Sequence, residues 1–413
     1  MQKTSTEFDL IVIGGGAAGF FGAIISAENK SGLSVLILEK TSKLLSKVKV
    51  SGGGRCNVTH NCFEPTPLSK HYPRGSKELK SLFRKFQAKD TVAWFESKHV
   101  NLKAEADGRM FPVTDNSQTI IDCFLREAEA HHIKVKLNSE VTKITPSKNG
   151  YDVLVGKEEH YSAKKILIAA GGYNNLPSYK WIAQTFHPII DPIPSLFTFN
   201  DSEKKFNDLM GIAVANAEVK IAGTKLSEQG PVLITHWGLS GPAIIKLSAW
   251  AADFLHGIHY NFTALVNWTG NTTEEELRQF LSDMKSKHGK QKVVTNPMFA
   301  IPHRLWQRLC ELAEIPETKI WAELPQKNTN KLIESLIRCP FHIKGKTTFK
   351  EEFVTCGGVD LKSIDVETME SKSMKGLYFA GEVLNMDGET GGFNFQSAWT
   401  TAYVAANSIA ANP

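Results

Sequence analysis

The hydrophobic positions near the start of the chain are continuous rather than alternating. Residues 8–13 form an apolar run with one acidic break, and residues 35–38 form a second run. Continuous runs of this length are typical of parallel strands that are buried on both faces. Between them, residues 17–27 are apolar and rich in small side chains. The pattern therefore predicts a strand, a helix and a second parallel strand.

In the middle of the chain, the hydrophobic positions recur with a different period. Residues 79–99 and 117–132 have helical spacing with polar faces. Short alternating runs between residues 134 and 162 predict an antiparallel meander, with a hairpin turn at Asn149-Gly150. A further buried strand is expected at residues 165–170, where it leads into two glycines. These elements extend the α/β pattern of the N-terminal part.

Prolines at positions between 177 and 194 mark a linker, after which the pattern becomes rich in strands and then in helices. Strand character returns at residues 376–380, and a helix rich in Ala, Ser and Thr follows from residue 393. We therefore expect a discontinuous nucleotide-binding domain, residues 1–190 and 346–413. An inserted β-rich domain is expected at residues 191–270 and 325–345, and a helical subdomain at residues 271–324.

Composition narrows the class of protein. The chain has 413 residues, 42% hydrophobic and 22% charged, with a net charge of +5, which suits a globular protein with an anionic ligand. It contains no apolar segment long enough to span a membrane and no secretory pattern. Its six cysteines form no C-x-x-C pair, so we expect reduced thiols, no metal site and a cytoplasmic location.

The first strand leads directly into a glycine cluster that is typical of dinucleotide sites. Gly14 permits the tight turn, Gly16 lets backbone approach a pyrophosphate, and Gly19 lets the helix pack closely. The helix that begins at Ala17-Ala18 presents its N-terminus to the phosphates. The second strand ends at Glu39, where a carboxylate can accept hydrogen bonds from ribose hydroxyls. A carboxylate at this position would also repel the 2′-phosphate of NADP, which argues against NADP binding here.

A second glycine cluster, Ser51-Gly52-Gly53-Gly54-Arg55-Cys56-Asn57, follows this unit. Consecutive glycines have a high entropic cost and make sense where backbone lies against a flat ligand or binds phosphate. A flexible surface loop is the alternative. Arg55 could pair with a phosphate or a substrate anion. Cys56 suits a redox role less well than a packing role, because no partner cysteine lies at a redox spacing.

Near the other end, Gly381-Glu382 follows a strand, and Gly391-Gly392-Phe393-Asn394 precedes the last helix. A carboxylate at Glu382 can bind a ribityl hydroxyl, and the helix N-terminus can stabilise negative charge on a reduced flavin ring. A plain helix cap is the alternative. If both ends belong to one site, the cofactor is FAD. The residues expected to contact it are Gly14, Gly16, Ala17, Ala18, Gly19, Glu39, Lys40, Ser51, Gly52, Gly53, Gly54, Arg55, Cys56, Asn57, Val141, Ala170, Gly171, Gly381, Glu382, Gly391, Gly392, Phe393 and Asn394.

Together with Gly108-Arg109-Met110-Phe111-Pro112 and residues 235–242 and 355–359, these segments resemble the aminoacetone oxidase-like (BaiN/YhiN-like) FAD-dependent oxidoreductases over nearly the whole chain. The resemblance implies a glutathione-reductase-type Rossmann domain with a β-meander, interrupted by a β-barrel-like piece and a helical piece. Relatives act in amine oxidation or in reduction of unsaturated steroid-type ketones. At Asn385 this chain departs from the family, which usually has Asp there, and this calls a charge-dependent role into question.

The leading hypothesis is hydride transfer between flavin N5 and a small organic substrate. A second G-x-G-x-x-G is absent, so NADH or NADPH, if used, has to visit the same cleft. No catalytic base stands out; Arg55, Asn57 and His236 are the candidates for substrate contact. Neither a nucleic acid nor a membrane is expected as a partner, and the oligomeric state stays open. The alternatives are a flavin-dependent RNA-modifying protein, supported by the pI of about 8.7 and the lysines after Glu39, and a non-catalytic flavin sensor.

Overall fold

The computed structural model describes residues 6–347 and 354–411. Residues 1–5, 348–353 and 412–413, all of the expected nucleotide-binding domain, lie outside the described part. The chain divides into two compact units, Met1–Ser195 with Lys350–Pro413, and Leu196–Phe349. Each unit has its own hydrophobic core. Within the described ranges, no helix is both long and apolar enough to span a bilayer.

The first unit is built on a nine-stranded sheet with the order β18-β19-β20-β9-β1-β2-β6, to which β7 and β8 are attached through β9. Strands β20, β9, β1, β2 and β6 are parallel neighbours, whereas β7, β8 and β9 form an antiparallel meander. The strands of this sheet are β1 (Thr6–Ile13), β2 (Val35–Leu38), β6 (Lys134–Lys136), β7 (Val141–Ser147), β8 (Gly150–Val155), β9 (Glu159–Ile168), β18 (Ile364–Asp365), β19 (Glu370–Ser371) and β20 (Leu377–Phe379).

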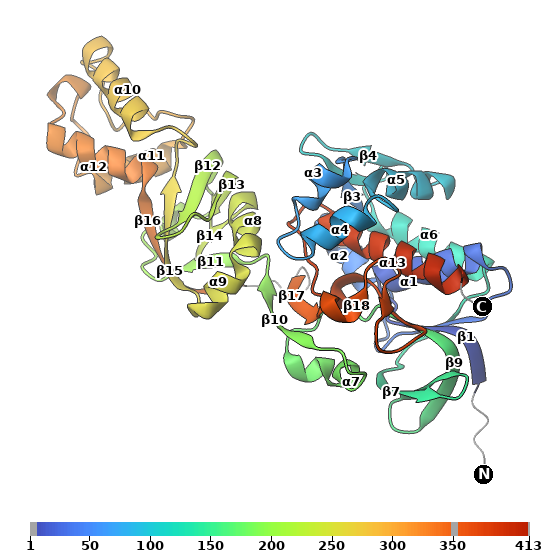
Figure 1. Cartoon of the computed structure of the whole chain (residues 1–413). Helices are drawn as coiled ribbons and strands as arrows, with labels where there is room; N and C mark the ends of the chain where they lie inside the picture. Colours follow the sequence, from blue (N-terminus) through green and yellow to red (C-terminus); the bar gives the residue numbers. More distant parts are fainter. Residues whose placement is uncertain (1–5, 348–353, 412–413) are drawn as a thin grey trace. The chain divides into compact units, whose positions relative to one another are not determined.

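Helices from the two ends of the chain pack together on this sheet. Helix α1 (Ala17–Asn29) lies beside α13 (Phe393–Ala411), and both are buried along most of their length (Figure 1). Small residues allow the close approach: a Cβ on Gly22 of α1 would lie 3.6 Å from Ala402 Cβ of α13. The C-terminal helix is therefore part of the core that the N-terminal strand begins.

Shorter elements complete the first unit. They are α2 (Ser46–Gly54), α3 (Pro65–Ser69), α4 (Ser76–Leu82), α5 (Ala88–Ser97), α6 (Ser117–Ala130) and α7 (Lys180–Ala183), a three-stranded sheet of β3 (Thr59–His60), β5 (Arg109–Pro112) and β4 (Leu102–Ala104), and a pair formed by β10 (Ile189–Ser195) and β17 (Val354–Val359). The single helix expected at residues 79–99 is two helices. Gln87 and Asp90 form a capping box that begins α5 anew. The separate strands expected at residues 160–162 and 165–170 are one strand, β9.

The second unit is a closed six-stranded barrel with three helices inserted between its last two strands in sequence. Its strands, in barrel order, are β11 (Thr198–Asp201), β14 (Gly238–Ser240), β13 (Ser227–Ile234), β12 (Ala213–Ile221), β15 (Asn261–Asn267) and β16 (Cys339–Thr347). Helices α8 (Pro242–Trp250) and α9 (Ala252–Gly257) follow β14, and α10 (Glu274–Lys287), α11 (His303–Leu312) and α12 (Gln326–Ile337) form the helical part (Figure 1). Residues 325–337, expected in the β-rich portion, contain α12 instead.

Candidate functional site

The parallel strands of the first unit end at one edge, and the register fixes which residues meet there. Ile13 pairs with Leu38 of β2 and with Ile168 of β9, and Ile168 pairs with Phe379 of β20. The segments that leave these strands, beginning at residues 14, 39, 169 and 380, therefore emerge side by side. This carboxyl edge is where open parallel sheets bind nucleotides. Three of the predicted glycine-rich segments and Glu39 converge on it.

The glycines between β1 and α1 are present for different physical reasons. Gly14 has φ +114°, and a Cβ there would lie 2.3 Å from Ala169 O, while a Cβ on Gly19 would lie 1.9 Å from Gly14 O. Both are required by the packing of the fold. Gly16, the N-cap of α1, has an ordinary φ of −93°, and a Cβ there would meet no atom within 4 Å. The packing of the fold therefore gives no steric reason for glycine at position 16.

Glu39 is held beside this turn by backbone groups. Its Oε2 accepts from Gly15 N at 2.8 Å, and its Oε1 accepts from Thr41 N at 2.8 Å. The carboxylate also lines a pocket at the end of β1. That pocket brings together five residues predicted from the sequence, which are Gly14, Glu39, Lys40, Val141 and Ala170.

The same pocket has an aromatic wall that the sequence reasoning missed. It is formed by Tyr173 and Trp181, with Ser139, Glu140 and Ser178 nearby. Lys40 Nζ lies 4.7 Å from the centre of the Tyr173 ring, and burial raises the pKa of Tyr173, although a hydrogen bond with Trp181 opposes this. The signal that could have found Tyr173 is its position directly after Gly171-Gly172, at the end of β9.

The segment of consecutive glycines is a sharp left-handed turn inside α2. Gly52 and Gly53 have φ values of +58° and +69°, and Gly54 has +86°. Glycine adopts this region at no steric cost. A Cβ on Gly52 would lie 2.8 Å from Phe111 Cε1, but one on Gly53 or Gly54 would meet nothing within 4 Å. The turn thus packs on one side and leaves its other side open. Ser51, at its start, donates from Oγ to Val48 O.

Arg55 is occupied by protein groups. Its Nη1 lies 2.6 Å from Glu105 Oε1 and 3.6 Å from Asp115 Oδ1, and its guanidinium stacks 4.0 Å over the Phe111 ring. These contacts give Arg55 a role in holding the turn. Cys56 is completely buried, and burial raises its pKa to about 12, which suits a packing role.

The start of α13 is joined to the segment that follows the glycine turn. In the amide orientation that satisfies both neighbours, Asn57 donates to Thr59 O at 3.1 Å and accepts from Gly392 N at 2.9 Å. Trp399 Nε1 donates to Val58 O at 3.0 Å. Asn394 closes its own loop, with Nδ2 donating to Gly388 O at 2.8 Å and Oδ1 accepting from Gly388 N at 2.9 Å. Gly391 and Phe393 are the neighbours in sequence of Gly392, whose N–H bonds to Asn57.

Glu382 links four distant parts of the first unit. Its Oε1 accepts from Thr355 N at 3.0 Å, and its Oε2 pairs with Lys47 Nζ at 2.5 Å. A Cβ on Gly172 would lie 3.0 Å from Glu382 Oε1. Gly381, before it, comes so close to α1 that a Cβ would lie 2.8 Å from Ala18 Cβ. The structure therefore places the C-terminal glycine-acid pair against the start of α1 and the end of β9.

Two further positions singled out from the sequence are His236, in the second unit, and Asn385, in the first. His236 is exposed in the β13–β14 loop of the second unit, where its ring packs edge-on against Trp237 at 4.1 Å. Asn385 donates from its backbone N to Val359 O at 3.0 Å. Its buried Oδ1 has no hydrogen-bond partner within the described part of the chain.

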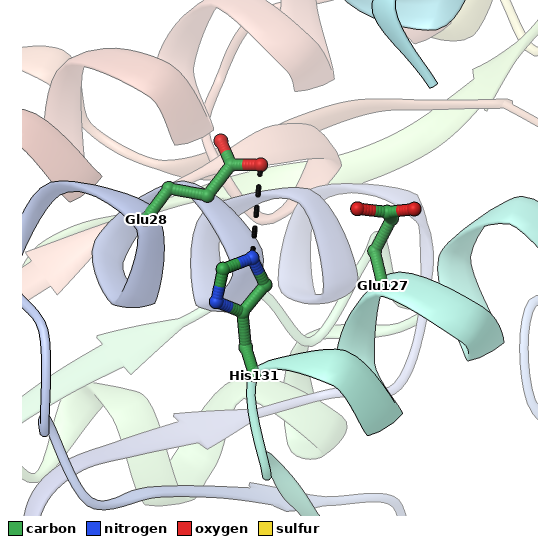
Figure 2. Close-up of side chains that lie close together, drawn as sticks. All are labelled: Glu28, Glu127 and His131. Carbon is green, nitrogen blue, oxygen red and sulfur yellow. Dashed lines mark ion pairs between the residues drawn. The ribbon is translucent and has the colours of Figure 1, made fainter. Parts of the chain in front are cut away.

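One group of side chains in the first unit has ligand types that metals use. Figure 2 shows Glu28 of α1, with Glu127 and His131 at the end of α6, whose ligand atoms all lie within 4.8 Å. Lys98 Nζ lies 2.6 Å from Glu28 Oε1 and 3.2 Å from Glu127 Oε2. This ammonium pairs with both carboxylates, and Arg126 Nε lies 3.3 Å from Glu127 Oε1. The group is therefore an ion-pair cluster, and His131 is the C-cap of α6.

Comparison with known proteins settles the family. Residues 8–408 match the model of the HI0933-like protein Rossmann domain. The chain belongs to this family. The aminoacetone oxidase-like resemblance read from the sequence is thereby confirmed.

Curated relatives match over almost their full lengths. The chain is 30% identical to a protein of Haemophilus influenzae and 29% identical to one of Escherichia coli, covering 97% and 98% of this chain and 98% of each relative. Both relatives are named ribosomal RNA dihydrouridine synthase. A 3-dehydro-bile acid Δ(4,6)-reductase of Clostridium scindens is 24% identical, covering 97% of this chain and 99% of the relative.

Among solved structures, 3-ketosteroid-Δ4-(5α)-dehydrogenase of Rhodococcus jostii matches with a TM-score of 0.56 at 14% identity, covering 100% of this chain and 98% of that one. This likeness concerns the fold. The predicted fold class, an FAD-binding Rossmann domain interrupted by a barrel and a helical module, is confirmed. The family and its structural neighbours are flavoenzyme oxidoreductases, which confirms the predicted enzyme class.

Proposed function

We propose that this protein is an FAD-dependent reductase of a carbon–carbon double bond conjugated to a carbonyl group, and that its substrate is a uridine of ribosomal RNA. The observation that carries the proposal is the carboxyl edge of the first unit's sheet. There, Gly16 leaves space that the fold does not need, and Glu39 stands beside the open N-terminus of α1. The names of the relatives then supply the reaction class.

The residues at this edge fit the two ends of FAD. The open N-terminus of α1 suits the pyrophosphate, because free N–H groups and the helix dipole favour an anion. Glu39 and the pocket beside it suit the ribose and adenine. On the other side, Glu382 suits the ribityl chain, and the turn at residues 51–54 and the loop at residues 391–394 suit the ring. Bound FAD would supply the pair of electrons, and the chain's residues would hold it, exclude water and deliver protons.

The names of these relatives describe one kind of chemistry. Dihydrouridine is uridine reduced at the double bond conjugated to its C4 carbonyl, and a Δ(4,6)-reductase of a 3-dehydro bile acid reduces double bonds conjugated to a ketone. In both cases a hydride adds to the carbon distant from the carbonyl, and a proton adds to the carbon next to it. Both reactions therefore need a hydride donor at the carbon distant from the carbonyl and a proton donor at the carbon next to it.

Ribosomal RNA is favoured over a small molecule by the relatives with the higher identity, 29% and 30% against 24%. The net charge of +5 also suits a polyanionic partner. This proposal departs from the sequence expectation that no nucleic acid binds, which rested on the lack of a basic stripe interleaved with aromatic residues. Reduction of a steroid-like enone is the second candidate, favoured by the bile-acid reductase.

The test begins with the purified protein, which should be yellow and release FAD on denaturation. Ribosomal RNA from cells that lack this gene is then incubated anaerobically with the protein and with NADH or NADPH, and its nucleosides are analysed by mass spectrometry. We expect dihydrouridine to appear in stoichiometric relation to nicotinamide oxidised. A 4-ene-3-ketosteroid in place of RNA tests the second candidate. Yellow protein that reduces neither substrate under either donor would contradict the proposed reaction.

A further inference from the structure

Two segments far apart in sequence lie against each other beside the loop that precedes α13. Glu389 N donates to His71 O at 3.0 Å, and Tyr72 Oη donates to Phe393 O at 2.7 Å. Arg74 Nε donates to Asp387 Oδ1 at 2.6 Å. The residues around His71 and the loop around Phe393 are therefore one rigid substructure. That substructure includes the residues 391–394 to which the proposed function assigns the flavin ring.

His71 is fixed within this substructure from two sides. Its ring stacks on Phe393 with centres 4.2 Å apart and planes 11° from parallel. Its Nδ1 lies 3.4 Å from Glu389 Oε2, in a pair where the Glu389 side chain is 8% exposed and the His71 side chain 33% exposed. A carboxylate at Nδ1 keeps the proton on that nitrogen in neutral imidazole, which leaves Nε2 to exchange a proton. No described residue hydrogen-bonds to Nε2.

The other proton donors nearby are occupied or buried. His60 also stacks on Phe393, at 4.7 Å, but its Nε2 contacts Asp107 O at 3.1 Å. Cys56 is fully buried, and burial also raises the pKa of Cys62, although a backbone hydrogen bond at Glu64 opposes this. The charged groups beside His71 in the described chain are, besides Glu389, the exposed Lys70 that precedes it, and Arg74 and Asp387, which pair with each other. His71 is thus the titratable side chain with an available edge.

We propose that His71 is the proton donor of the reduction, and that the buried Glu389 carboxylate is its positioning residue. The inference rests on the proposed function. The substrate gains a hydride at the carbon distant from the carbonyl, with electrons that NADH or NADPH supplies by way of the reduced cofactor. The protonated imidazole gives its Nε2 proton to the carbon next to the carbonyl, which is C5 of uridine. The imidazole becomes neutral and regains a proton from solvent.

The test compares wild type with His71→Asn and with a matched control, His132→Asn, which alters an exposed histidine after α6. Each protein is reduced anaerobically and mixed with ribosomal RNA in D2O. We expect the His71 variant to keep its FAD and its reduction rate by NADPH, and to reoxidise with RNA about 100-fold more slowly or worse, in line with the loss of a general acid. The control should match wild type.

The position of deuterium separates a chemical role from a structural one. In wild type, deuterium should enter one face of C5 of the dihydrouridine, because the donor is fixed. In His71→Asn, solvent delivers the proton, and deuterium should enter both faces. Glu389→Gln should shift the pH profile of reoxidation while leaving the affinity for RNA within about twofold.

A second measurement does not depend on turnover. On purified wild-type protein, diethyl pyrocarbonate should modify His71 several-fold faster than His60, since the Nε2 of His60 is held by Asp107. If wild type is never reoxidised by RNA or an enone, the proposed function fails and this inference falls with it. If wild type reacts but His71→Asn reacts equally fast with deuterium on one face, or if His71 resists modification, the inference alone is overturned.

Discussion

The two halves of the candidate site are made in opposite ways. At the nucleotide half, where β1 turns into α1, the decisive feature is unfilled space in front of Gly16. At the ring half, around Phe393, polar groups are already satisfied by one another across segments more than 300 residues apart, as Arg74 and Asp387 show. The first half is a tight turn with one open face, and the second is a set of segments joined by their own polar side chains. Substitutions in the first half should change the affinity for FAD. Substitutions in the second half should change the stability of the fold or the rate of the reaction.

The largest effect is expected at Gly16. The Cβ of a Gly16→Val side chain would meet no atom within 4 Å, and the position needs no unusual backbone, so the free energy of unfolding of the FAD-free protein should fall by no more than about 1 kcal/mol, the cost of an apolar N-cap. The affinity for FAD should fall by about 1,000-fold, roughly 4 kcal/mol, because the methyl groups occupy the pyrophosphate position. Calorimetric titration with FAD measures this.

Gly19→Ala is the matched comparison for Gly16. Its Cβ would lie 1.9 Å from Gly14 O, so it should lower stability whether or not FAD is present. Equal effects of the two substitutions on the unfolding of FAD-free protein would show that Gly16 serves the fold after all.

At the ring half, Arg74→Leu should destabilise the fold. Asp387 is fully buried and also accepts from Ser195 Oγ at 3.1 Å, and removing one member of a buried ion pair costs about 3–5 kcal/mol. Denaturant unfolding measures the loss. The double variant Arg74→Leu/Asp387→Leu should recover part of it, since no charge is then left buried alone. An Arg74→Leu variant as stable as wild type would show that the pair of Arg74 and Asp387 does not stabilise this part of the fold.

A smaller effect is expected at Glu39. Glu39→Gln should weaken FAD binding about tenfold, roughly 1.4 kcal/mol, because an amide is a poorer acceptor for ribose hydroxyls than a carboxylate. Lys43→Gln, on the exposed loop that follows, is the control and should change affinity little. Unchanged FAD affinity in Glu39→Gln would show that the ribose of FAD does not bind beside Glu39.

The smallest effect concerns Cys56, which follows the glycine turn at residues 52–54. Burial raises its pKa to about 12, so at pH 8 only about 1 in 10,000 thiols is ionised. Iodoacetamide should leave Cys56 unmodified in the native protein while labelling Cys62, as mass spectrometry of peptides would show. Cys56→Ser should keep wild-type turnover. Rapid labelling of Cys56, or lost turnover in the serine variant, would restore a redox role for this thiol.

The nucleotide half could be predicted from the sequence because its determinants are local. The packing of a strand, a turn and a helix within 24 residues requires Gly14 and Gly19. The strand register carries Glu39 and Ala170 to the same edge. The aromatic wall was missed because only Tyr173, which directly follows Gly171-Gly172, has a signal nearby in the sequence, whereas Trp181 has none.

The ring half could be predicted only as far as its glycines. Ion pairs such as Arg55 with Glu105 join segments 50 residues apart, and the contact of His71 with Glu389 joins segments 318 residues apart. Periodicity and motif spacing carry no information on such pairs. For the same reason the sequence indicated Arg55 as an anion partner, whereas the structure surrounds it with carboxylates, and it gave no sign of His71.

The central claim is that the electrons of the reduced protein pass to a conjugated carbon–carbon double bond. The most direct measurement mixes anaerobically reduced protein with ribosomal RNA from cells lacking the gene, and follows flavin absorbance and dihydrouridine together. We predict that one dihydrouridine forms for each flavin reoxidised. Reduced protein whose flavin stays reduced with this RNA and with a steroid-type enone, but is reoxidised by oxygen, would contradict the account.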